Sequence, residues 1–182
     1  MSDLNQTQAA ILAFLFDKLP IGLEVETLNF CLAGNFSGKF HSAVGTIDGS
    51  EQDGEIVFSV PSYTNDVFLA LTHKNKHQVA RVLANVEDYE RENHCELDHS
   101  DVVLVRAIVG EADLERYGVL LIRTATSPEL IAVPDTMNIA GREVRFFLAV
   151  PLTRDEYIYR EQFGHDALMD MFSEKSKSLY FF

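Results

Sequence analysis

The stretch Glu143-Val144-Arg145-Phe146-Phe147-Leu148-Ala149-Val150 carries the strongest indication of fold class in this chain. Four of its apolar residues share one parity: Val144, Phe146, Leu148 and Val150. Successive side chains of a strand point to opposite faces of a sheet, so residues of one parity line one face. The stretch therefore predicts a strand that turns an apolar face to the core.

A helix start follows this strand at once. Thr153 and Glu156 have the spacing of a capping box, in which each side chain accepts a hydrogen bond from an otherwise unpaired backbone N–H. Pro151 stands just before it, where proline is tolerated. Further positions then recur at helical spacing: Tyr157, Gly164, Leu168, Met171 and Phe172. Gly164 either admits a close neighbour or divides the stretch into two short helices.

The N-terminal part of the chain predicts another helix over residues 4–19, which Asp3 or Asn5 can cap and Pro20 ends. Its apolar stripe comprises Ile11, Leu12, Leu15, Phe16 and Leu19. The 3–4 spacing of that stripe is typical of a helix that covers a core with one face.

The remaining pattern predicts strands separated by a helical middle. The strands are expected at 23–32, 39–47, 55–60, 102–109, 119–123, 130–133 and 143–150. A change of parity near Thr27 indicates a bulge or a change of buried face. The middle, from Val67 to Val86, is predicted to be helical. Because helices and strands do not alternate strictly, we predict a single α+β domain over residues 1–182, with a mainly antiparallel sheet and flanking helices.

Length and composition indicate a globular chain. Of its 182 residues 47% are apolar, which is enough to bury a core. No apolar run approaches the roughly 20 residues that cross a bilayer, so we expect no membrane partner. The first residues lack the pattern of a secretory signal. Cys31 and Cys95, the two cysteines, are expected to be reduced thiols in the cytoplasm.

The charge of the chain bears on its partners. Fifteen basic and 28 acidic residues give a net charge of −13. Such a surface repels phosphate backbones, so we expect no nucleic-acid partner. A basic protein is a suitable partner, because opposite charge steers association.

Ligand-type side chains gather in the middle of the sequence without matching a known metal pattern. His73 and His77 are four residues apart, as on one helix face, and His94, Cys95 and His99 form a second group. We expect neither a catalytic residue nor a metal nor a cofactor here. These four histidines are nevertheless the candidates on which an alternative enzyme hypothesis rests.

The chain ends in Leu179-Tyr180-Phe181-Phe182. An exposed aromatic end of this kind indicates a partner surface. Docking of the same residues onto the chain's own sheet explains them equally well, and the sequence leaves the two interpretations open.

The region from Phe146 to Phe172 resembles the C-terminal end of the suppressor-of-fused domain family. The resemblance rests on Phe147-Leu148-Ala149-Val150-Pro151-Leu152, on Asp155-Glu156-Tyr157, and on Gly164-His165-Asp166-Ala167-Leu168-Met169-Asp170-Met171-Phe172. It implies an α+β domain that binds proteins and catalyses nothing. Eukaryotic relatives sequester a transcription factor, and bacterial relatives are often linked with immunity proteins that neutralise a toxin domain.

Three hypotheses for function follow. The leading one is a non-catalytic protein-binding domain, of the immunity type that neutralises a basic toxin such as a nuclease. The first alternative is a metal-dependent or hydrolytic enzyme that uses His73, His77, His94 and His99. The second is a scaffold or oligomerisation protein. The sequence does not specify the partner's identity or the oligomeric state.

Overall fold

The computed structural model describes residues 4–19, 21–32, 36–47, 54–104 and 117–182, and only the backbone of residues 23–32 and 36–38. The helices are α1 (Gln6–Lys18), α2 (Lys76–Asn93), α3 (Arg154–Phe163) and α4 (His165–Glu174), with short 3-10 helices at Thr124–Thr126 and Pro128–Leu130. The strands are β1 (Ile21–Leu32), β2 (Phe36–Ile47), β3 (Glu55–Val60), β4 (Asp66–Thr72), β5 (Val102–Leu104), β6 (Gly118–Ile122), β7 (Thr136–Ile139) and β8 (Arg142–Leu152).

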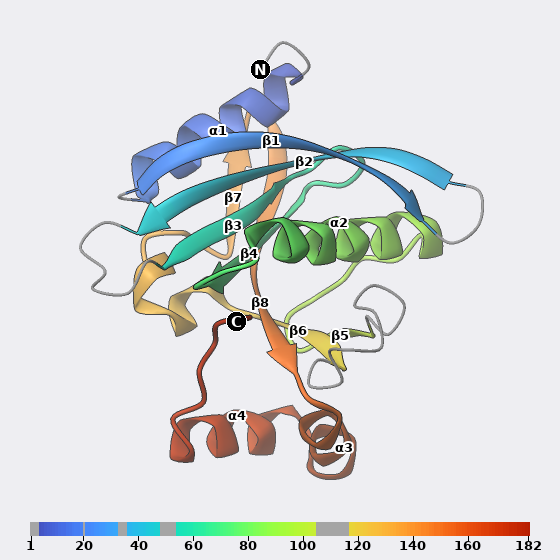
Figure 1. The fold of residues 1–182 in the computed structure, drawn as a ribbon, viewed down its shortest axis with the longest axis vertical. Coiled ribbons are helices and arrows are strands. Elements are labelled where there is room, and N and C mark those ends of the chain that lie inside the picture. Colours follow the sequence, from blue (N-terminus) through green and yellow to red (C-terminus); the bar gives the residue numbers. More distant parts are fainter. Residues whose placement is uncertain (1–3, 20, 33–35, 48–53, 105–116) are drawn as a thin grey trace.

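The described strands form one curled sheet in the order β1-β2-β3-β4-β8-β6-β5, and β7 also pairs with β8 (Figure 1). The pairing between β4 and β8 is parallel, and the other pairings of these named strands are antiparallel. The predicted α+β class with a mainly antiparallel sheet is therefore confirmed. None of the described helices combines the length and apolar character needed to span a membrane.

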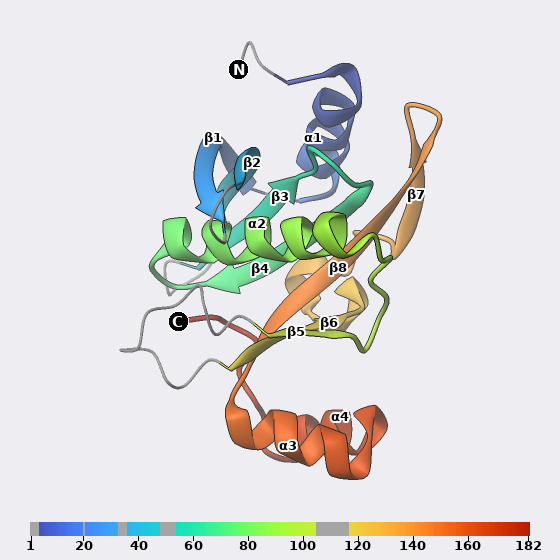
Figure 2. The same cartoon turned by 90° about the vertical axis from the view of Figure 1, so that its right-hand side faces the viewer.

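Strand β8 pairs with β4, β6 and β7, and both of its faces are covered. The predicted face is confirmed, since Val144, Phe146, Leu148 and Val150 belong to one buried cluster that also contains apolar residues of α1 and α4. Phe147 and Ala149, on the other face, pack in a second cluster with residues of α2. Figure 2 shows α1 and α2 against this sheet, with the α3–α4 pair beyond the end of β8.

Strand β4 corrects the prediction of a helical middle. Val67–Leu71 lies in a strand whose seven residues are all buried, because β4 sits inside the sheet between β3 and β8. A strand buried on both faces has no polar alternation and reads as a continuous apolar run, which periodicity does not separate from a helix. The helix begins only at Lys76.

Three further differences from the sequence prediction are local. Residues 130–133 form no strand, because the 3-10 helix Pro128–Leu130 and a following turn occupy this segment. Strand β7 was not predicted, and it joins β8 through Ala140 and Gly141, which have φ values of 51° and 78°. The pairing of β1 with β2 runs without a skipped residue from Ile21 to Leu32, so of the two alternatives predicted near Thr27 the bulge does not occur. The other alternative, a change of buried face, concerns side chains outside the described residues.

The helix boundaries agree well with the predicted caps. Glu156 N–H donates to Thr153 Oγ1 at 3.2 Å and Thr153 N–H to Glu156 Oε2 at 2.8 Å, which confirms the capping box. Asn5 caps α1 in the same way. Gly164 has a φ of 90° and separates α3 from α4, so the interpretation of two short helices is confirmed. Phe16 departs from the predicted apolar stripe, with 48% of its surface exposed.

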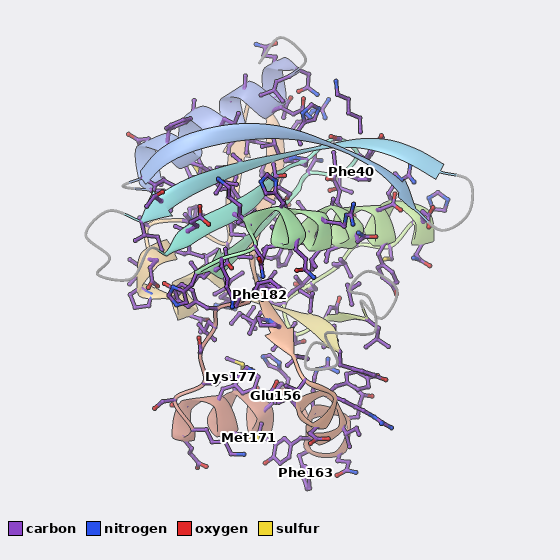
Figure 3. The ribbon with its side chains drawn as sticks, viewed as in Figure 1. Phe40, Glu156, Phe163, Met171, Lys177 and Phe182 are labelled. Carbon is purple, nitrogen blue, oxygen red and sulfur yellow. The ribbon has the colours of Figure 1, made fainter. Side chains whose placement is uncertain are left out.

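The C-terminal residues dock onto the sheet. Phe181 N–H donates to Leu71 O at 2.8 Å, Tyr180 forms a parallel bridge with Leu71, and Phe181 is 3% exposed. Figure 3 shows Phe182 beside the sheet, whereas Phe163 lies at the far end of the α3–α4 pair. Of the two interpretations that the sequence left open, docking is the one confirmed.

Candidate functional site

A cleft of about 670 Å³ opens where three segments meet. The cleft is lined by residues of three segments. These are the turn before β4 with its first residue (Tyr63–Asp66), the end of α2 with the residues that follow it (Glu90–Glu96), and the start of β8 (Arg142–Arg145). In Figure 2 the C-terminal end of α2 lies beside β8, so segments distant in sequence form its walls. The volume lies in the range of about 300–1,000 Å³ that is usual for ligand sites.

An ion pair between two neighbouring strands forms the floor of the cleft. Asp66 and Arg145 are partners in the parallel register of β4 and β8. Arg145 Nε donates to Asp66 Oδ1 at 2.8 Å, and its Nη2 donates to Oδ2. Two parallel hydrogen bonds of this kind fix the planar guanidinium in one orientation. Asp66 is only 3% exposed, so the pair is built into the sheet.

Glu90 of α2 completes the floor. Its Oε1 accepts a hydrogen bond from Leu97 N–H at 3.0 Å and lies 3.5 Å from Arg145 Nη2. Its Oε2 is buried and receives no hydrogen bond from a protein donor. Burial, and secondarily the neighbouring Asp66 carboxylate, raise the pKa of Glu90 above neutrality. Burial therefore favours the protonated form of Glu90 beside Asp66.

Glu87, one turn earlier in α2, holds the wall of the cleft. Its Oε1 accepts hydrogen bonds from Ser62 N–H at 2.6 Å and from Tyr63 N–H at 2.8 Å. The residue is fully buried, and desolvation raises the pKa of its carboxyl to about 7. The next carboxyl of the helix, Asp88, is buried as well.

The rim of the cleft carries solvated groups. Glu96, Glu143 and Arg142 are exposed, and none of these three forms an ion pair with another described residue. Arg91 is engaged, since its Nη2 lies 2.6 Å from Asp88 Oδ1 and its guanidinium lies 4.9 Å from the centre of the Tyr63 ring. Of the three exposed residues at the rim, which a ligand can reach, two are acidic and one is basic.

The four histidines of the enzyme hypothesis are placed at two ends of α2. His73 precedes the helix and stacks on Tyr180, with ring centroids 4.2 Å apart, so it does not share a helix face with His77. His94 ends the helix, and His99 contacts the ring of Phe147 at 4.8 Å. The helix has 18 residues and is therefore about 27 Å long. The described residues contain no group of three or more ligand-type side chains able to hold a metal ion.

Sequence reasoning found parts of this site and missed others. His94 and Cys95 line the cleft, and Cys95 is a half-buried free thiol. The side chain of Cys31 lies outside the described residues. Asp66, Glu90 and Arg145 were not predicted. Arg145 could have indicated the site, because it is a charged residue inside the apolar strand β8. A charged residue in that position needs a buried partner of opposite charge.

Comparison with known proteins places the chain in a family. The family model for Suppressor of fused protein (SUFU) matches residues 40–181, so the similarity begins far upstream of the stretch that suggested it. The crystal structure of a suppressor of fused homologue from Neisseria gonorrhoeae matches with a TM-score of 0.70 and 16% identity, over 99% of this chain and 94% of that one.

Two further solved structures match less closely. They are the Sufu–Fu complex, with a TM-score of 0.47 and 11% identity over 80% of this chain and 67% of that one, and Drosophila Suppressor of Fused, with 0.46 and 11% over 84% and 38%. No curated protein sequence matches the chain. Because the family model covers more than half of the 182 residues, this chain belongs to the suppressor of fused protein family.

Proposed function

We propose that this chain is a non-catalytic, protein-binding domain of the immunity type, which neutralises a basic toxin in the cytoplasm. Membership of the suppressor of fused family is the observation that carries the proposal. A member of that family is known in complex with a protein partner, Fu. Residues 1–182 act in this proposal as one domain, without nucleic acid, metal or cofactor.

Charge supports a basic partner. The net charge of −13 gives a field that attracts a positively charged protein and accelerates encounter. Near the cleft the acidic surface is carried by Glu92, Glu96 and Glu143, which are exposed. The buried acids of α2 contribute less to that field, because burial raises the pKa of Glu87 and of Glu90 and so favours their neutral forms.

The test begins with partner identification. A toxin-like protein encoded beside the gene for this chain is produced with an inactivating substitution, and binding is measured by surface kinetics at two salt concentrations. We expect association to slow steeply with added salt while dissociation changes little. An acidic partner, or association that is insensitive to salt, would contradict the electrostatic part.

Matched charge reversals locate the contact. Glu96→Lys and Glu143→Lys, at the rim of the cleft, should each slow association, whereas Asp17→Lys makes the same charge change on α1, at a side chain that is 73% exposed. An equal effect of all three variants would show that only net charge matters. If none of the variants affects binding and the purified protein turns over a small substrate, the protein-binding proposal is wrong.

A further inference from the structure

The lining of the cleft contains a buried carboxylate oxygen, Oε2 of Glu90, that has no hydrogen-bond donor among the described residues. Glu90 is 4% exposed, and its Oε2 receives no hydrogen bond from any described residue. A buried carboxylate oxygen without a donor has lost its hydration and gains no hydrogen bond in return, which is unfavourable, and more so when the group is charged. The floor of the cleft therefore favours a ligand that carries a hydrogen-bond donor.

In the free protein a proton on the Glu90 carboxyl takes the place of an external hydrogen-bond donor. Burial raises the pKa of Glu90, and Asp66, which is itself held by Arg145, raises it further. Hydrogen bonds from Leu97 N–H and from the Thr64 side chain act in the opposite direction. A proton on Glu90 lowers the negative charge of the two carboxyl groups, and Arg145 lies beside both of them. A cation that carries several N–H groups would satisfy both carboxylates in place of the proton.

The described arginines that line the cleft donate no hydrogen bond to Glu90 Oε2. Arg145 is held at Asp66 by two hydrogen bonds, and its Nη2 lies 3.5 Å from Oε1 of Glu90, so this ion pair gives Glu90 Oε2 no donor. Arg91 lies against Asp88 and the Tyr63 ring. Arg142 stands at the exposed rim. Glu96 and Glu143 also line the cleft and are exposed, so they add negative charge at its rim.

We propose that this cleft binds the cationic end of an arginine or lysine side chain from the protein partner, with the Glu90 and Asp66 carboxylates as its acceptors. The inference rests on the proposed function, since it assigns the partner's contact to a particular site. Binding displaces the proton of Glu90 to solvent, so the bound state keeps the charge of the floor balanced. The partner's side chain thereby reaches a site that is enclosed on three sides by β4, α2 and β8.

The test uses small probes and the full chain. N-acetyl-arginine methylamide is titrated by calorimetry at pH 7 in two buffers of different ionisation enthalpy, and N-acetyl-norleucine methylamide serves as the uncharged control. We expect the arginine probe alone to bind, with release of up to one proton. Below the pKa of Glu90, the affinity should rise with pH by as much as about tenfold per pH unit, because the probe and a proton compete for one site.

Variants separate the floor from the rim. Glu90→Gln should weaken the probe by more than about tenfold, since a neutral amide replaces the carboxylate that the cation needs. Glu96→Gln should have a smaller effect, and Asp17→Asn none. If Glu90→Gln does not fold, the pH dependence and proton release of the unaltered protein remain the criterion.

The outcomes also distinguish this inference from the proposed function. Probe binding without proton release, or no binding at millimolar concentration, overturns the inference even where the toxin partner binds. Binding of inorganic phosphate that is lost in Arg142→Gln would identify an anion site and overturn it as well. Probe binding as expected, without any protein partner, would instead sustain the site and contradict the immunity role.

Discussion

Asp66 and Arg145 are paired twice, once by backbone register and once by their side chains. They are partners in the parallel pairing of β4 with β8, and the guanidinium of Arg145 grips the Asp66 carboxylate with two hydrogen bonds. The residues are 79 positions apart. A slip of this pairing by one residue would separate the charges in a buried site, so the ion pair helps to set the register of the central strands.

Breaking this ion pair on one side should destabilise the protein strongly. Arg145→Met leaves Asp66 and Glu90 without their cation, and we expect a loss of about 3–5 kcal/mol in the free energy of unfolding. The double variant Asp66→Asn/Arg145→Met removes both charges and should recover part of that loss. Urea denaturation measures both. Equal losses in the single and double variants would contradict coupling between the two residues.

Stability should fall as pH rises from about 4.5 to about 7, because of Glu87. The pKa of this carboxyl is higher in the folded state, at about 7, than the ordinary value of 4.5, so the folded state binds more protons in this window. The shift corresponds to a loss of about 3 kcal/mol between the two ends of the window.

Glu87→Gln tests this prediction, because the amide keeps an acceptor for Ser62 and Tyr63 N–H but does not titrate. The difference in unfolding free energy between pH 5 and pH 8 should shrink by about 3 kcal/mol in the variant. Asp17→Asn, at an exposed carboxyl, should leave that difference unchanged. An unaltered pH profile in Glu87→Gln would refute the assignment.

Loss of the α3 cap should destabilise the protein modestly. Thr153→Ala removes the hydroxyl that accepts a hydrogen bond from Glu156 N–H, and we expect a loss of about 1 kcal/mol. Ser173→Ala, at an exposed position inside α4, also removes a hydroxyl and should be neutral or slightly stabilising. Thermal unfolding of the two variants gives the comparison, and equal midpoints would rule out a capping contribution.

The two helices beyond β8 should differ in their dependence on phenylalanine. Phe172 of α4 is 5% exposed and packs in the core, whereas Phe163 of α3 is 61% exposed. Phe172→Ala should lower the free energy of unfolding by about 3–5 kcal/mol, and Phe163→Ala by less than about 0.5 kcal/mol. A large loss in Phe163→Ala would mean that α3 is covered in solution.

The histidines should not hold a metal ion tightly. His73 and His77 lie at one end of α2, and His94 and His99 at the other. Elemental analysis after mild purification should find well below one equivalent of zinc or nickel. A full equivalent that disappears in His77→Ala but not in His165→Ala, a histidine of α4, would revive the enzyme alternative.

Local interactions made part of this fold legible in the sequence. The cap of α3 needs only Thr153 and Glu156, which are three residues apart, and the apolar face of β8 needs only alternation along one strand. Such features depend on neighbours in sequence, so pattern reasoning recovers them.

The sequence by itself thus determined the α+β class, the capped helices and the acidic charge of this protein. Only the tertiary structure decided that Val67–Leu71 is a strand and that Asp66, Arg145 and Glu90 meet in one cleft. The physical reason is that these features depend on contacts between residues that lie far apart in the sequence. An apolar run that is buried on both faces is held as a strand by the strands that pair with it. A buried charge is stable only beside a partner, and here that partner comes from a distant part of the sequence.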